Sequence, residues 1–130
     1  MADTVDTKVI YESHRHYVAR FTNISDGTGE SLVKKIDVST LTNATGATCT
    51  YLVIDQINWS VQGFTSVRLF FDATTDDKLA VLSGNNYVDF REFGGMVDPK
   101  STGTTGDILL TTAGATSGNT YYIVIHARKK

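Results

Sequence analysis

Apolar and polar residues alternate along most of this chain with a period of two. Successive side chains of a β-strand point to opposite faces, so each alternating run predicts a strand with one apolar and one polar face. The clearest runs are rich in β-branched and aromatic residues, which favour a pleated surface. They occupy residues 14–21, 32–39, 51–61, 67–72 and 121–128.

The alternation also predicts which side chains of each run share a face. The first run places Tyr17, Ala19 and Phe21 inward, with His16, Val18 and Arg20 on the opposite side. The second places Leu32, Lys34, Ile36 and Val38 on its mostly apolar face. The third gathers Tyr51, Val53, Ile57, Trp59 and Val61, with an interruption at Asp55. The last two gather Val67, Leu69 and Phe71, and then Tyr121, Ile123, Ile125 and Ala127.

Segments rich in Gly and Asn separate these runs, and both residues supply the positive φ values that tight connections need. The turns recur too often for long helices, and the one helix-permissive stretch, 76–82, is short. Eight or so short strands in one domain predict an all-β fold, a single antiparallel β-sandwich of jelly-roll type.

The sequence predicts one domain with two segments outside the strands. Residues 1–7 lack apolar periodicity and are predicted to be a flexible N-terminal arm, so the β-sandwich domain covers residues 8–130. Residues 94–106 form a long connection that holds Pro99, the only proline, beside Met96 and Val97. Arms and long loops of compact domains are frequent contact sites.

Composition narrows the classes of function. The net charge of −2 offers no field that would attract nucleic acid. Neither an export signal nor a membrane span is visible in the sequence, which predicts a protein made in a cytosol with no membrane partner. Cys49 is the only cysteine, so no intrachain disulfide is expected.

The stretch His14-Arg15-His16 is the sharpest candidate for chemistry. Residues two apart on a strand point to one side, so His14 and His16 would be able to share a metal ion. Zinc needs a third protein ligand, and His126 is the only other histidine. The favoured interpretation is a polar strand face, with no metal or other cofactor, and the metal site stays as the alternative.

Other candidate sites are weaker. Asp26, Thr28 and Glu30 resemble a cation loop, and 72–78 is a denser acidic loop, but both are favoured as ordinary turns. No nucleophile elbow, phosphate-binding glycine loop or Cys-His arrangement is present, so an enzyme is not expected. Four large aromatic residues would stack on sugars if they were exposed, namely Trp59, Tyr87, Phe90 and Tyr122.

Several longer stretches of the chain resemble a known protein family. They are Arg20-Phe-Thr-Asn-Ile-Ser-Asp-Gly-Thr-Gly-Glu-Ser31, Ser60-Val-Gln-Gly-Phe64, Asp72-Ala-Thr-Thr-Asp-Asp77, Leu82-Ser-Gly-Asn85, Gly106-Asp-Ile-Leu-Leu-Thr-Thr-Ala-Gly114, Gly118-Asn-Thr-Tyr121 and Arg128-Lys-Lys130. Together they resemble the short virion structural proteins encoded in the head-gene modules of tailed bacteriophages. The resemblance runs from about Lys8 to Lys130.

This resemblance implies a capsid cement or decoration protein. Such a protein binds the outside of the major capsid protein lattice, often as a homotrimer, and its location is the exterior of the virion. No catalytic motif comes with the family. We predict that the capsid-facing or trimer-forming surface contains two segments, with the residues Tyr11, His14, Arg15 and His16 in one and Met96, Val97 and Pro99 in the other.

A second function from a different class stays open at this point. A β-sandwich displayed on a virion or its tail would also bind host-surface sugars through exposed aromatic residues. Copy number distinguishes the two, because a decoration protein is present in hundreds of copies and a tail component in a handful or a few dozen.

Overall fold

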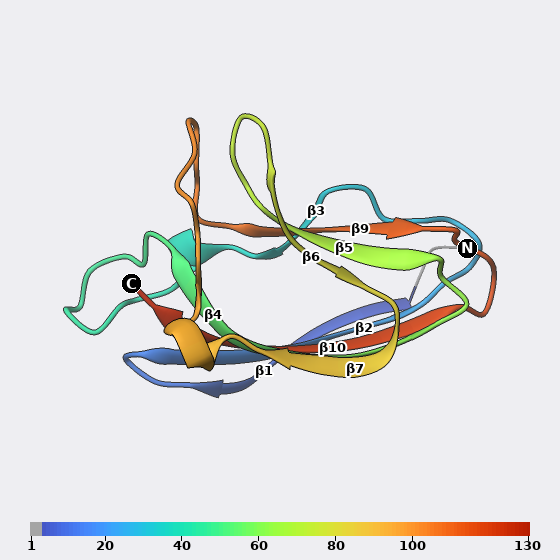
Figure 1. Cartoon of the computed structure of the whole chain (residues 1–130), viewed down its shortest axis with the longest axis horizontal. Coiled ribbons are helices and arrows are strands. Elements are labelled where there is room, and N and C mark those ends of the chain that lie inside the picture. The colour runs from blue at the N-terminus through green and yellow to red at the C-terminus, as the bar shows by residue number, and fades with distance from the viewer. Residues whose placement is uncertain (1–3) are drawn as a thin grey trace.

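The computed structural model describes residues 4–130, which form two antiparallel β-sheets packed face to face (Figure 1). The six-stranded sheet contains β1 (Thr4–Glu12), β2 (His16–Ile24), β10 (Thr120–Lys129), β4 (Leu52–Gln62) and β7 (Gly84–Asp89) in that order, with the short β8 (Met96–Val97) also paired to β4. The four-stranded sheet has the order β3 (Val33–Ile36), β9 (Ile108–Ala113), β5 (Ser66–Phe71) and β6 (Asp77–Leu82). Two 3₁₀ turns, η1 (Val38–Thr40) and η2 (Arg91–Phe93), lie in connections.

The strand order is that of a jelly roll, which confirms the predicted fold class. The connections β2–β3, β4–β5, β6–β7 and β9–β10 each pass from one sheet to the other. Each strand of the four-stranded sheet therefore faces one of the strands β2, β10, β4 and β7. β1 is an additional strand at the edge of the six-stranded sheet and has no counterpart in the facing sheet.

The core lies between the sheets and is filled by apolar side chains from both. The inward residues of β2, β5 and β10 are those that the alternation predicts, because these strands keep their period through the core. Phe21, Leu69 and Ile123 are fully buried, and Tyr17, Ala19, Val67, Phe71, Tyr121, Ile125 and Ala127 join them in one cluster.

The face predicted for residues 32–39 is wrong at Leu32 and Lys34. β3 carries a bulge, because Lys34 and Ile36 pair with adjacent residues of β9 and Lys35 has no opposite partner. The extra residue reverses the alternation. Ile36 and Val38 point into the core as predicted, but Leu32 and Lys34 are exposed and the ammonium group of Lys35 is buried.

A second bulge changes the predicted face of residues 51–61. In β4, Gln56 and Ile54 pair with the adjacent residues His126 and Ala127, and Asp55 is the extra residue. Ile57, Trp59 and Val61 point inward as predicted, but before the bulge the core residues are Leu52 and Ile54. Tyr51 is only partly buried, and Val53 is buried but lies outside the main core cluster, contrary to the predicted face.

Three segments have more regular structure than the sequence suggests. The predicted arm 1–7 is wrong at residues 4–7, which belong to β1 and pair with β2; residues 1–3 lie outside the described residues. The helix-permissive stretch 76–82 is mostly strand β6, where Leu79 and Leu82 pack on the core. The connection 94–106 contains β8, so Met96 and Val97 are paired to β4.

Candidate functional site

The outer face of the six-stranded sheet carries two exposed tyrosine rings beside amide and hydroxyl groups. Tyr122 lies opposite Ser60, which lies opposite Asn85. In the next row, Asn58 lies opposite Tyr87. We call these five residues the tyrosine patch. The side chain of Ser60 donates a hydrogen bond to Asn85 Oδ1 over 2.7 Å.

The two rings of the tyrosine patch are accessible and well separated. Tyr87 is 62% exposed and Tyr122 is 45% exposed. They stand two strands apart and two residues apart along the strands, which places their Cα atoms about 12 Å from each other. Asn58 and Ser60 lie between them on β4, so a ligand that covers both rings also meets these polar groups.

A polar hollow of about 280 Å³ adjoins the tyrosine patch on the same face. Its lining includes Tyr11 from β1, His16 from β2, His126 from β10, Gln56 from β4 and Arg91 from η2. Gln56 connects the two regions, because its side-chain amide donates to Asn58 Oδ1 over 3.4 Å. The hollow offers a ring, two imidazoles, an amide and a guanidinium to one ligand.

The Arg91 guanidinium, at the edge of the hollow, forms an ion pair with Asp89. The Asp89 carboxylate accepts hydrogen bonds from Arg91 Nε over 2.9 Å and from Nη2 over 2.7 Å. These side-chain bonds, followed by the bond from the Arg91 backbone N–H, lower the pKa of Asp89 from 3.8 to about 2. The Asp89 carboxylate is therefore ionised at neutral pH and becomes half protonated only at a pH of about 2.

Removing the guanidinium should raise the pKa of Asp89. In the Arg91→Gln variant we expect the pKa of Asp89 to rise from about 2 toward 3.8 without reaching it, because the bond from the backbone N–H of residue 91 remains; NMR of the Asp89 carboxyl carbon measures this. A folded-state pKa below the unfolded value stabilises the protein above the unfolded pKa, so wild type should lose this contribution as pH falls toward 2. An unchanged Asp89 pKa in the variant would contradict the assigned cause.

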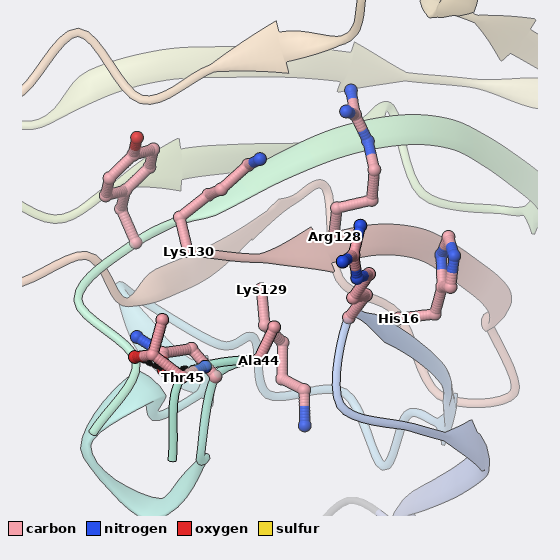
Figure 2. Close-up of a pocket in the computed structure, with 9 residues that line it drawn as sticks. His16, Ala44, Thr45, Arg128, Lys129 and Lys130 are labelled. Atoms are coloured by element: carbon pink, nitrogen blue, oxygen red, sulfur yellow. Dashed lines mark hydrogen bonds between the residues drawn. The ribbon is translucent and has the colours of Figure 1, made fainter. Parts of the chain in front are cut away.

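A basic pocket of about 430 Å³ lies at the end of the six-stranded sheet (Figure 2). Arg15, His16, Arg128, Lys129 and Lys130 line it, together with the loop that carries Ala44 and Thr45. Arg128 and Lys129 extend to opposite sides of β10, as neighbouring residues of a strand do (Figure 2).

Ion pairs neutralise two of the five basic groups in this pocket. Arg128 Nε is 3.0 Å from Asp55 Oδ1, and Lys129 Nζ is 3.0 Å from Glu12 Oε2. The Lys129 side chain is buried by this arrangement. Arg128 and Lys129 therefore contribute to the structure of the sheet as well as to the positive charge of the basic pocket.

The structure brings part of the predicted contact surface together. Tyr11 and His16 both line the polar hollow, and Arg15 lines the basic pocket with His16. His14 is exposed in the turn between β1 and β2. Met96 is partly buried against the core, while Val97 and Pro99 are exposed at the opposite edge of the same sheet. β2, β10 and β4 separate the two segments.

The three histidines considered as metal ligands do not all line one hollow. His16 and His126 line one hollow, but His14 does not. Across residues 4–130 no group of three or more His, Cys, Asp and Glu side chains is close enough to hold a metal ion.

Two of the four aromatic residues considered for sugar binding are unavailable for it. Trp59 packs against the core and donates from Nε1 to the Ser83 carbonyl over 2.9 Å, and Phe90 is buried. Sequence reasoning did not select Asn58, Ser60 and Gln56 as binding residues. Their alternation on the polar face of 51–61 was the available signal.

The cation loop suggested by residues 25–30 has its oxygen atoms directed differently. Asp26 Oδ1 accepts hydrogen bonds from the Thr28 backbone N–H over 3.0 Å and from the Thr28 hydroxyl over 2.7 Å. Glu30 turns inward instead and forms an ion pair with Lys35. Asp26 and Glu30 therefore serve two different parts of the fold.

No helix within the described residues has the length and apolarity to span a membrane.

Comparison with known proteins gives a likeness of fold. No family model and no curated protein matches this chain. Among solved structures, a cupin domain from Bordetella pertussis Tohama I has 8% sequence identity and a TM-score of 0.41, covering 100% of this chain and 97% of that one. A family 29 carbohydrate-binding module has 10% identity and a TM-score of 0.42, covering 97% and 88%. A cupin protein of the RmlC-like type from Desulfovibrio desulfuricans has 11% identity and a TM-score of 0.36, covering 93% and 80%.

Proposed function

We propose that this protein is a non-enzymatic carbohydrate-binding module, displayed on a virion, whose ligand lies across the tyrosine patch. The observation that carries the proposal is the position of Tyr87 and Tyr122 on either side of Asn58 and Ser60. Tyrosine offers a flat apolar ring for the C–H face of a sugar. Amide and hydroxyl side chains supply donors and acceptors for the sugar hydroxyl groups. The virion setting rests on the sequence resemblance.

The shape of the face favours an extended ligand over a small one. The tyrosine patch is open and continues through Gln56 into the polar hollow, so a chain of sugar units would contact both regions. An open site excludes less water than a deep cleft and gives modest affinity. Display in many copies would raise the effective affinity for a cell surface that repeats the same glycan.

A glycan array followed by calorimetry tests the proposal. The wild-type protein should bind a subset of oligosaccharides, with shorter members of a bound series binding more weakly. Phe93→Ala is the matched aromatic control for substitutions of Tyr87 and Tyr122, and it should leave glycan binding unchanged. Phe93 is an exposed ring in η2 and lies outside the tyrosine patch. Absence of binding to every glycan on the array at millimolar protein concentration would overturn the proposal.

The resemblance to virion structural proteins supports a second candidate function, that of a capsid cement protein. Its proposed contact surface contains the exposed side chains of Tyr11 and Val97, at opposite edges of one sheet. A β-sandwich that bridges subunits at two edges would stabilise a shell through several weak contacts.

Co-sedimentation distinguishes the second candidate from the first. Mixed with capsids that lack it, a cement protein should sediment in a fixed ratio to the major capsid protein and raise the melting temperature of the shell. A glycan-binding module attached to the tail would stay in the supernatant. Hundreds of copies per purified particle would also support the cement function, and a few dozen would contradict it.

A further inference from the structure

β1 is an edge strand with an uncovered apolar side. Val5 and Val9 lie opposite Asn23 and Ala19, two inward-facing residues that are almost fully buried. Because no strand of the four-stranded sheet faces β1, Val5 and Val9 remain 42% and 43% exposed although they point to the inner side. Val5 and Val9 are therefore exposed because the facing sheet has no strand opposite β1.

The backbone of β1 is also open on one side. β2 pairs with one edge of β1, and no other strand within residues 4–130 pairs with the opposite edge. Such an edge is a template for another strand, and proteins commonly protect it with an inward or outward charge. Here the outer side of β1 carries Asp6 and Lys8, two residues apart and of opposite sign.

These charges make β1 complementary to itself. We propose that two copies of this chain associate through antiparallel pairing of their β1 strands about a two-fold axis at Thr7. In this register Asp6 lies opposite Lys8 of the second copy on the outer side. Val5 lies opposite Val9 of the second copy on the inner side. The contact is isologous, so each pair occurs twice and the two six-stranded sheets become one.

Neighbouring registers are less favourable because of the same two charges. A shift that centres the pairing on Asp6 places that carboxylate opposite its own copy, and a shift that centres it on Lys8 does the same for the ammonium group. Like charges directly opposite each other destabilise a strand pair. The Asp6–Arg20 contact, at 3.8 Å and largely exposed, does not fix Asp6 in another arrangement.

The apolar surface near the axis extends beyond β1. β3 is an edge strand of the four-stranded sheet, and Leu32 and Val33, just before and at its start, are exposed. In the dimer they would border the cluster formed by Val5 and Val9 from both copies. The predicted assembly is a dimer, which differs from the trimer implied by the sequence resemblance.

Charge reversal tests the register on the full chain. Sedimentation velocity should show a reversible dimer for wild type, and Asp6→Lys or Lys8→Asp should each raise the dimer Kd by about tenfold or more. The double variant Asp6→Lys/Lys8→Asp should restore the wild-type Kd. A mixture of the two single variants should form heterodimers more readily than either forms homodimers.

The matched control is Lys78→Asp, which makes the same charge change on β6, the edge strand of the other sheet. It should leave the dimer Kd unchanged. A wild-type chain that is monomeric or trimeric at all concentrations would overturn the proposal. So would a dimer that the single variants leave intact, or one that the double variant fails to restore. Glycan binding by the tyrosine patch does not depend on any of these outcomes.

Discussion

The Lys35→Met variant should lose about 3 kcal/mol or more of its free energy of unfolding. Lys35 Nζ lies 2.6 Å from Glu30 Oε2, and the two side chains are only 3% and 8% exposed. Tyr121 OH donates to Glu30 Oε1 over 2.5 Å, and Asn23 Nδ2 donates to the same oxygen over 3.1 Å. Removing the ammonium group leaves a buried carboxylate without its counter-charge, which is the costly way to break such a pair.

The double variant Glu30→Gln/Lys35→Met should recover much of that loss. Glutamine keeps an oxygen that accepts from Tyr121 and Asn23, and it carries no charge that needs Lys35. Replacing both members of a buried ion pair by uncharged side chains of similar size is often close to neutral. Chemical denaturation of wild type, both single variants and the double variant measures the coupling.

An equal loss in the Lys35→Met variant and the double variant would contradict this account. It would mean that the packing of the Lys35 side chain, rather than the charge left on Glu30, carries the stability. Arg91→Gln provides the control for an exposed ion pair, because the side chains of Arg91 and Asp89 are 64% and 33% exposed. Its effect on the free energy of unfolding should be much smaller than that of Lys35→Met, as for other exposed pairs.

The second large effect concerns the proposed ligand. Tyr87→Ala and Tyr122→Ala should each weaken glycan binding by about tenfold, and the double variant should abolish measurable binding. Each substitution removes a ring on which a sugar would stack, and both side chains are exposed, so the fold should tolerate the change. Isothermal titration with the best ligand from the array gives the affinities, and thermal melting confirms that the variants are folded.

Conservative variants separate stacking from hydrogen bonding. Tyr87→Phe and Tyr122→Phe keep the ring and remove the hydroxyl, so most of the affinity should remain. Asn58→Ala should weaken binding without removing a ring, because the amide lies opposite Tyr87. Full affinity in the double alanine variant would show that the ligand binds elsewhere on the protein.

How far the sequence predicts this fold depends on whether a strand keeps its period. β2, β5 and β10 do, and their buried residues follow from alternation alone. β3 and β4 each contain one extra residue, and the period breaks there. Both extra residues are charged and form ion pairs, Lys35 with Glu30 and Asp55 with Arg128. The alternation of apolar and polar residues in the sequence marks such an extra residue only weakly.

The candidate site, like the fold, is predictable only in part from the sequence. The outward direction of His16 follows from its own strand, but its place beside Tyr11 and His126 depends on strand order. Tyr87 and Tyr122 are separated by more than 30 positions in the chain and approach each other because β4 lies between β10 and β7. Strand order is a long-range property that no local pattern encodes.

The sequence by itself determined an all-β chain, the turns between its strands and the apolar faces of its regular strands, because side-chain direction in a strand depends on local position. Only the tertiary structure decided that β1 is paired with β2 yet uncovered on its inner side. Coverage depends on how many strands the facing sheet contains and on where each connection crosses. The tertiary structure likewise placed two tyrosines from distant strands on one face, since pairing between β4 and its neighbours fixes that distance.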